Sequence, residues 1–285
     1  MQNSPNSNKI INLLSDQIQE EWSPHFEPVE LKLGQVLYEP GRAIGHLYFP
    51  LTAIVSWVHI LESGASSEIA ITGREGIVGI YLLMGAAQTN HRAIVQKAGS
   101  AIRIRLSVVL NSFNQGNTVQ KIFLRYTQTL LNQISQVSVC NRHHSLEQQL
   151  CRMLLLTLDR QDSKTIVLTH ELMANLLGVR REGVTHAAHR LMNENILHYS
   201  RGNITVLDRK ASLMASMVGV AQEDGADQVL LFVIDILKEE ATLLVPNDLV
   251  KQMAEASFGV TVSGDTVVIP GLMSRKKQII PALKL

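Results

Sequence analysis

Residues 169–190 carry the side chains whose types and spacing best suit contact with a polyanion. Arg181 and Glu182 are adjacent, and His186 lies one helical turn beyond Glu182, so a helix would present them together. Arginine pairs bidentately with guanine, and glutamate accepts a hydrogen bond from the amino group of cytosine. The spacing predicts a surface that reads base edges of duplex DNA; the simpler alternative is an ordinary exposed, charged helix.

Two short helices joined by a turn are needed to position these side chains. Thr169 is a good N-cap, Glu171 falls in the first turn where the helix dipole favours an anion, and Gly178 falls where the turn needs a left-handed residue. A hairpin follows at 197–207, with its turn at 200–203. The pattern predicts a winged helix-turn-helix whose second helix starts at Arg180 and whose buried positions are Met173, Leu177, Val179, Val184 and Ala187.

Within the first 160 residues the sequence pattern changes twice, from helical to β-prone and back to helical. An apolar spacing over 10–22 predicts one amphipathic helix. Short β-prone runs at 47–49, 54–60, 68–71, 93–95 and 101–104, separated by glycine and proline, then predict a β-sandwich or barrel. Glycine and proline are absent between Gly116 and Gly178, and Ser145 with Gln148 forms a capping-box pattern that opens a second helix. A short strand is expected at 165–168.

A narrow apolar stripe marks the long helix that begins near residue 118. Its steps of three and four residues are typical of a coiled-coil seam, so we expect a parallel dimer; the alternative is a helix that lies on its own domain. The expected seam residues are Phe123, Tyr126, Leu130, Ile134 and Val137.

Composition limits the class of protein. The chain has 285 residues, of which 46% are hydrophobic and 18% charged, which excludes a disordered chain. The sequence has only two cysteines, and it shows neither an apolar leader nor a long apolar run. We therefore expect a cytoplasmic protein without a membrane span. The net charge is +1, but residues 141–210 hold ten Lys and Arg against seven Asp and Glu, so this segment is the electrostatic candidate for DNA.

The order of these elements, with Leu168 to Leu172 and Gly178 to Val184, resembles the Crp/Fnr family of bacterial regulators. The resemblance implies an α+β chain: an N-terminal helical segment (1–28), a double-stranded β-helix or jelly-roll effector-type domain (29–113), a dimerisation helix (114–142) and a winged helix-turn-helix (143–210). Residues 211–285 continue past the point where such regulators commonly end, and we expect them to form an extra α/β extension. Homodimers, double-stranded DNA and RNA polymerase are the implied partners.

The same resemblance assigns roles to single residues. The base-reading pair falls on Arg181 and Glu182, while His186 replaces a further arginine. Gly183 stands where the family usually has threonine. Glycine at this position should lower the stability of the helix by about 1 kcal/mol. Phosphate contacts are expected from Thr169, His170, Arg180, Thr185, Arg201 and Gly202.

The effector positions depart from the nucleotide-binding members of the family. Those members use a Gly-Glu pair and a later arginine, where this chain has Gly79, Ile80, His91 and Arg92. Ile80 cannot accept a hydrogen bond, and Arg92 is displaced by one position, which turns a strand side chain to the other face. We expect a degenerate pocket with no cyclic nucleotide and an unknown effector; a cyclic-nucleotide-responsive activator is the alternative.

No cofactor or metal is expected. An N-terminal iron–sulfur cluster lacks ligands because no cysteine precedes Cys140. Cys140, His143, His144 and Cys151 include only one typical ligand spacing, so a helix junction with two buried thiols is favoured over a metal site.

The extension at 211–285 has a net charge of −3 and no readable role. Helices are expected at 229–240 and 247–256, and a hairpin around Gly264 and Asp265. Residues 267–271 faintly resemble the end of short-chain dehydrogenases, but the piece is too short for their nucleotide fold. No enzyme is inferred, although an enzyme that uses this extension is an alternative of another class.

Overall fold

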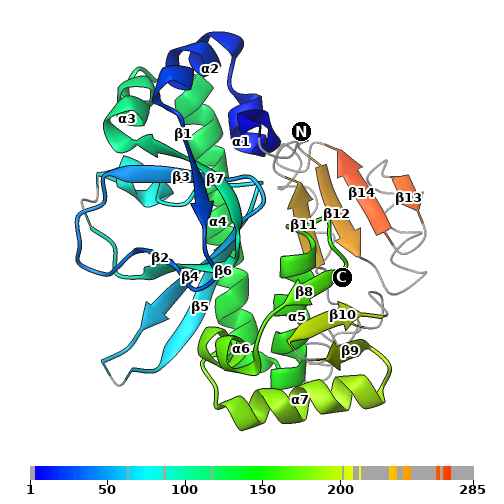
Figure 1. Cartoon of the computed structure of the whole chain (residues 1–285). Helices are drawn as coiled ribbons and strands as arrows, with labels where there is room; N and C mark the ends of the chain where they lie inside the picture. Colours follow the sequence, from blue (N-terminus) through cyan, green and yellow to red (C-terminus); the bar gives the residue numbers. More distant parts are fainter. Residues whose placement is uncertain are drawn as a thin grey trace. The chain divides into compact units, whose positions relative to one another are not determined.

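The computed structural model describes residues 4–62, 64–85, 88–116, 118–200, 202–207 and 212, and the backbone of four strands between 231 and 270. The chain divides into two compact units, Met1–Ser216 and Met217–Leu285 (Figure 1). No helix within the described ranges is both long and apolar enough to cross a membrane.

The first unit opens with short helices rather than one. These are η1 (Pro5–Ser7), α1 (Lys9–Leu13), α2 (Asp16–Trp22) and η2 (Ser23–His25). The single helix expected over 10–22 is wrong, because Leu14 is extended and Ser15 restarts the chain as the N-cap of α2. The apolar positions are nevertheless buried, and Trp22 Nε1 donates to Ser112 Oγ at 3.0 Å.

A β-roll of two antiparallel sheets follows. One sheet has the order β1-β7-β3 and the other the order β2-β6-β4-β5. All five expected runs form strands, but β1 and β2 were not foreseen. The strands are β1 (Glu27–Leu31), β2 (Val36–Tyr38), β3 (His46–Pro50), β4 (Ile54–Ile60), β5 (Ser66–Thr72), β6 (Arg92–Lys97) and β7 (Gly99–Arg105), with the 3-10 helix η3 (Ile80–Met84) between β5 and β6.

The four-stranded sheet is covered on both faces. Val55 and Val95 point into the roll, where they pack with Tyr38. Val58 and Ile94 belong to the core of the helical region that follows the roll. A strand that is covered on both sides does not alternate between buried and exposed residues, which explains why Ile54 to Val58 of β4 are all buried.

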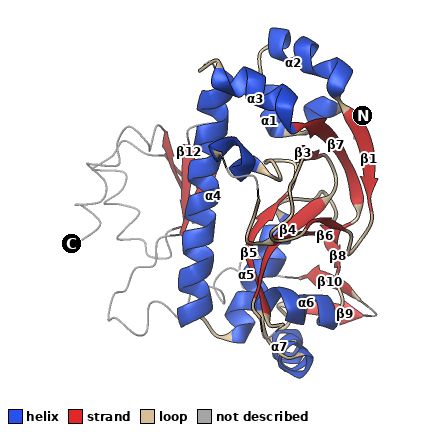
Figure 2. Cartoon of the chain, turned by 90° about the vertical axis from the view of Figure 1, so that its left-hand side faces the viewer, coloured by secondary structure: helices blue, strands red, loops and turns tan. Residues whose placement is uncertain are grey.

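Helices α3 (Leu106–Asn114) and α4 (Thr118–His143) continue from the roll, and α4 runs along its side (Figure 2). The predicted long helix is confirmed. The expected dimer seam needs correction, because the stripe is used within the chain: Phe123 contacts the rings of Trp22 and Phe113, and Tyr126 donates to the Ile77 carbonyl at 3.2 Å. Leu130 and Val137 are also buried, and Ile134 is half-buried.

The predicted winged helix-turn-helix completes the first unit. After α5 (Leu146–Leu158), opened by the predicted capping box of Ser145 and Gln148, the chain forms β8 (Thr165–Val167), α6 (His170–Leu177), α7 (Arg181–Asn193), β9 (Leu197–Ser200) and β10 (Asn203–Val206). The three strands form a sheet of order β8-β10-β9. The α+β class and the order of roll, long helix and winged helix-turn-helix are therefore confirmed.

The described part of the second unit is an antiparallel sheet of order β11-β12-β14-β13. Its strands are β11 (Leu231–Asp235), β12 (Glu240–Leu244), β13 (Thr261–Ser263) and β14 (Thr266–Pro270). The antiparallel pairing of β13 with β14 confirms the hairpin expected here, while its turn residues, 264 and 265, lie outside the described residues. The helix expected over 229–240 is wrong, because its aromatic and β-branched run forms β11, which pairs with β12. The helix expected at 247–256 lies outside the described residues.

Candidate DNA interface

The turn between α6 and α7 has the geometry that the sequence predicts. Thr169 caps α6 by accepting from Leu172 N at 3.1 Å. Gly178 ends α6 in the left-handed conformation, with φ of 70°, and Val179 N returns to the Ala174 carbonyl at 3.0 Å. This closure fixes the direction in which α7 leaves the turn.

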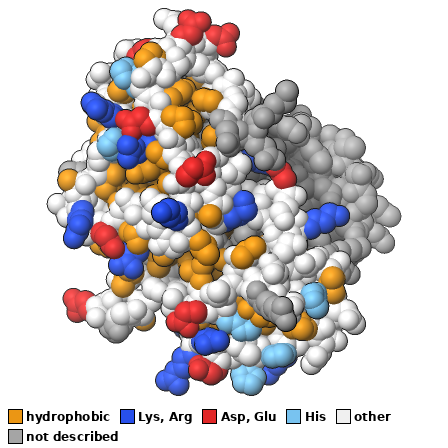
Figure 3. Space-filling model, viewed as in Figure 1, with side chains coloured by type: hydrophobic (Ala, Val, Ile, Leu, Met, Phe, Trp, Pro, Cys, Tyr) orange, Lys and Arg blue, Asp and Glu red, His pale blue; other side chains and the backbone are white. Residues whose placement is uncertain are grey.

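Helix α7 buries one face and exposes the other. Val184, Ala187 and Leu191 are buried in the core of the helical region, whereas Arg181, Glu182 and His186 are exposed. Figure 3 shows basic, acidic and histidine side chains gathered over this end of the molecule. Arg180 is the N-cap residue of α7 and is also exposed. The arrangement offers a helix N-terminus with long polar side chains to a partner.

Gly183 lies where α7 passes α5. A Cβ at Gly183 would lie 3.1 Å from the Leu146 side chain, so glycine allows a close approach of the two helices. Arg190 further along α7 pairs with Glu147 of α5 at 2.8 Å, although the arginine is largely exposed. The two contacts hold the first and last turns of α7 against the start of α5.

His170 and Thr185 bind each other rather than standing free. Thr185 Oγ1 donates to the Arg181 carbonyl at 3.1 Å, so its proton is used there. His170 Nδ1, 3.0 Å from Thr185 Oγ1, must then be the donor in their contact. Nε2 of His170 is buried without a partner among the described atoms. The two residues therefore link α6 to α7.

Tyr199 of the wing adds to this link, and the sequence analysis did not single it out. Its ring stacks on the imidazole of His170 with centroids 4.3 Å apart. Burial, helped by the charges of Arg181 and His189, lowers the pKa of His170. A neutral imidazole between Thr185 of α7 and Tyr199 of β9 is suited to holding α7 and the wing in place. The aromatic residue in a wing strand was the available signal.

The wing places its glycine as expected. Gly202 is left-handed, with φ of 83°, and its carbonyl accepts from Leu168 N at 3.0 Å. Arg201, the expected phosphate contact beside it, lies outside the described residues.

Of the expected effector positions, Gly79, Ile80 and His91 are buried and Arg92 is partly exposed. Ile80 is fully buried in η3, and Gly79 before it is left-handed with φ of 99°. Arg92 pairs with Glu39 at 2.8 Å. His91 is buried, and burial lowers its pKa to about 4.

Aromatic rings surround His91. Trp57 stacks on it with centroids 4.7 Å apart, and Tyr38 and Tyr81 meet it edge-on. Thr89 Oγ1 lies 2.7 Å from its Nδ1. These contacts pack the four rings against one another.

The two cysteines are free and buried. Cys140 lies near the end of α4 and Cys151 in α5, where burial raises the pKa of its thiol to about 11. Within the described residues, no group of three or more His, Cys, Asp or Glu side chains gathers as a metal site would.

Comparisons with known proteins agree with this geometry. Residues 148–211 match the Crp-like helix-turn-helix domain. A Crp/Fnr-family regulator from Eubacterium rectale superposes with a TM-score of 0.60 at 17% identity, over 74% of this chain and 99% of that one. FixK2 from Bradyrhizobium japonicum gives 0.58 at 15% identity, over 66% and 95%. The chain carries a Crp-like helix-turn-helix domain on the fold of Crp/Fnr transcription regulators.

The C-terminal region matches a different family. Residues 200–285 match the DHHA2 domain, and not a dehydrogenase. Over the C-terminal region, the manganese-dependent inorganic pyrophosphatase of Methanocaldococcus jannaschii is 33% identical across 89 residues, which are 29% of this chain and 28% of that enzyme. The chain spans about a quarter of the length of the curated relatives it matches.

Proposed function

We propose that the chain is a sequence-specific, DNA-binding transcription regulator that reads bases with Arg181, Glu182 and His186. The exposure of these three side chains on α7, above a buried apolar face, carries the proposal. Arg181 pairs with guanine and Glu182 accepts from cytosine in the major groove. Imidazole is a weaker reader of guanine than guanidinium, so His186 contributes less discrimination.

Phosphate contacts come from the edges of the same surface. Arg180 at the start of α7, Thr169 at the start of α6, and Arg201 with Gly202 in the wing supply them. His170 and Thr185 act on each other, so their contribution is to hold α7 against α6 and the wing. Phosphate contacts orient the protein on the duplex, whereas base contacts specify the sequence.

The regulator acts as a parallel homodimer through the exposed face of α4. Leu124, Leu131 and Val139 are about half exposed on this helix, while the stripe expected for the seam is buried in the chain's own core. Pairing two copies of α4 along this face would cover these side chains. Two-fold symmetry then presents two α7 helices to inverted half-sites about one helical turn apart.

The roll holds no cyclic nucleotide in this proposal. Packing of His91 among Trp57, Tyr38 and Tyr81 supports it, as does the pairing of Arg92 with Glu39. Cyclic-nucleotide-responsive activation would require these rings to move apart. We place the regulator in the cytoplasm with RNA polymerase as its protein partner, as its fold family implies.

A second candidate function belongs to the C-terminal unit. Its match to DHHA2 domains and the run Arg275, Lys276 and Lys277 support binding of pyrophosphate or another phosphorylated ligand. Hydrolysis belongs to relatives about four times longer than the matched stretch. We therefore assign binding without turnover. Calorimetric titration with pyrophosphate, with and without manganese, and an assay of released phosphate test both parts.

Selection from random duplexes tests the DNA proposal directly. The full chain should enrich an inverted repeat with a guanine–cytosine step in each half-site. Recovery of unenriched sequences at every round would contradict sequence-specific recognition.

A further inference from the structure

A cavity opens on the roll between an edge strand of one sheet and an edge strand of the other. These strands are β2, at one side of the four-stranded sheet, and β3, at one side of the three-stranded sheet (Figure 1). Residues 39–45 connect them, and the wall of the cavity comprises residues 36–39, 42–46 and 48. Its volume of about 310 Å³ is at the lower end of the ~300–1,000 Å³ of small-molecule sites.

The cavity is distinct from the expected effector pocket, because none of the four residues expected there lines it. The two sites are nevertheless neighbours. Tyr38 of the cavity wall meets the His91 ring edge-on, with centroids 6.2 Å apart, and Glu39 of the wall pairs with Arg92 at 2.8 Å. A ligand in the cavity would therefore touch residues that contact the effector positions without entering the packed rings.

Apolar side chains form much of the wall. Leu37, Ile44 and Tyr48 pack against the core of the roll, so buried residues support the wall from behind. Val36 is 37% exposed, which leaves an apolar side chain of the wall in contact with water. The apolar body of a ligand would cover this side chain and remove its surface from water.

Arg42 is a cation on the wall that has no partner of its own. Its side chain is exposed, and it forms no hydrogen bond or ion pair with the residues that the structure describes. Glu39, the acidic residue of the wall, is already paired with Arg92. The wall therefore offers one free guanidinium to an incoming anion.

His46 adds no second positive charge to the wall near neutral pH. Burial and the charges of Arg103 and Arg105 lower its pKa, against the opposing charge of Glu27. Glu27 is itself paired with Arg103, whose Nε donates to the carboxylate at 2.9 Å. One uncompensated cation suits a singly charged carboxylate, which arginine binds through two parallel hydrogen bonds, better than a phosphate group with about 1.5–2 negative charges.

We propose that this cavity binds a small monocarboxylic acid with an apolar body, and that the acid is an effector of the regulator. The carboxylate pairs with Arg42, and the apolar body lies against Val36 and Ile44. The role as an effector rests on the proposed function, but the binding itself does not.

Strand β6 connects the cavity to the winged helix-turn-helix. Arg92, at the start of β6, pairs with Glu39 of the cavity wall. Further along the strand, Ile94 packs against the core of the helical region, and Gln96 Nε2 donates to Thr157 Oγ1 of α5 at 3.2 Å. A ligand that moves Glu39 would therefore act on a strand that contacts α5.

Methyl NMR of the full, isotope-labelled chain tests the binding and needs no DNA. Hexanoate should shift the Ile44 methyl signals most and should leave those of Ile80, buried in η3, unchanged. Hexanamide has the same apolar body without the charge and should bind about tenfold more weakly. Acetate has the charge without the body and should also bind about tenfold more weakly, or less.

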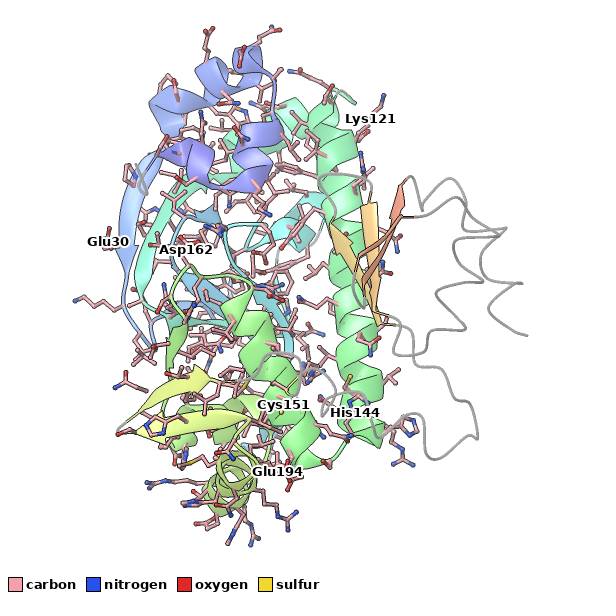
Figure 4. The ribbon with its side chains drawn as sticks, turned by 90° about the vertical axis from the view of Figure 1, so that its right-hand side faces the viewer. Glu30, Lys121, His144, Cys151, Asp162 and Glu194 are labelled. Atoms are coloured by element: carbon pink, nitrogen blue, oxygen red, sulfur yellow. The ribbon has the colours of Figure 1, made fainter. Side chains whose placement is uncertain are left out.

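Arg42→Gln tests the charge without disturbing the fold. Because Arg42 is exposed and unpaired, the variant should keep the parental melting temperature and bind hexanoate only as weakly as hexanamide. Lys121→Gln removes an exposed cation near the start of α4 (Figure 4), and this matched control should bind hexanoate like the parent. Val36→Asp gives an independent reading, because a carboxylate on the wall repels the acid but not the amide.

The effector role is measured as DNA affinity on a site enriched from random duplexes. Hexanoate should change that affinity in the parent and in Lys121→Gln but not in Arg42→Gln. If no duplex is enriched, the effector role falls with the proposed function, while the methyl titration still decides the binding.

Four results would overturn the proposal. They are an absence of hexanoate shifts or larger shifts at Ile80 than at Ile44, equal binding of hexanoate with acetate or hexanamide, parental hexanoate affinity in both Arg42→Gln and Val36→Asp, and an unchanged affinity for an enriched duplex in a chain that binds hexanoate.

Discussion

Gly178 approaches Ser66 so closely that a Cβ at Gly178 would lie 2.7 Å from the Ser66 carbonyl oxygen. Ser66 Oγ also donates to the Asn175 carbonyl at 2.7 Å. The turn of the helix-turn-helix therefore rests on β5 of the roll. Glycine serves here both the left-handed turn and the contact between the two parts.

Gly178→Ala should therefore cost more than an ordinary left-handed glycine. A left-handed alanine alone lowers the free energy of unfolding by about 1–2 kcal/mol. Gly34→Ala should show this loss by itself, because Gly34 has φ of 76° and open space around it. Gly178→Ala should exceed that value because backbone must also move. Urea unfolding of both variants measures the difference; equal losses would contradict the role of the Ser66 contact.

His170 and Thr185 should show coupling in a double-mutant cycle. Because each uses the other as a partner, His170→Ala and Thr185→Val should be non-additive in unfolding free energy by about 0.5–3 kcal/mol. In DNA binding, His170→Ala should leave the salt slope unchanged, since a neutral imidazole displaces no counterion. Arg201→Ala should lower the slope by about 1. A lowered slope for His170→Ala would restore it as a phosphate contact.

Leu131 and Leu130 are neighbours with opposite expected phenotypes. Leu131 is 54% exposed and Leu130 only 7%. Leu131→Asp should sediment as a monomer with little loss of thermal stability, because it charges the exposed face of α4. Leu130→Asp should mainly unfold the chain, because it buries a charge. A Leu131→Asp protein that remains dimeric would place the seam elsewhere.

His91 should make the fold acid-sensitive. Its folded pKa of about 4 lies below the ordinary 6.5, so its contribution is present above 6.5 and is lost as pH falls toward 4. The shift corresponds to about 3 kcal/mol. His91→Phe keeps the stack on Trp57 and should flatten stability over this range, whereas His198→Phe, at an exposed position, should not. Parental acid sensitivity in His91→Phe would contradict a buried, neutral His91.

The winged helix-turn-helix could be predicted because its signals are local. Thr169, Gly178 and Gly202 act on neighbouring backbone, and the structure places each as expected. The exposure of Arg181 followed from the same helical phase. The pairing of His170 with Thr185 and Tyr199 needed the tertiary contact among α6, α7 and the wing.

Partner assignment was the harder inference. The stripe containing Phe123 and Tyr126 predicted a buried face correctly, but periodicity does not say whether the same chain or a second copy covers it. The contact at Gly76 shows that the same chain covers the stripe, because a Cβ at Gly76 would lie 2.3 Å from the Tyr126 hydroxyl oxygen. The 229–240 segment failed differently, because a short apolar run containing Phe232 fits a strand as well as a helix.

Binding-site selection with Arg181→Ala tests the central claim most directly. If α7 lies in the major groove with Arg181 on a guanine, the variant should lose about 1–3 kcal/mol on the parental site and relax one base step per half-site. The parent and Arg190→Ala, whose arginine pairs with Glu147, should select the same full consensus. If Arg181→Ala selects the parental consensus unchanged, Arg181 is not a base reader and the placement of α7 is wrong.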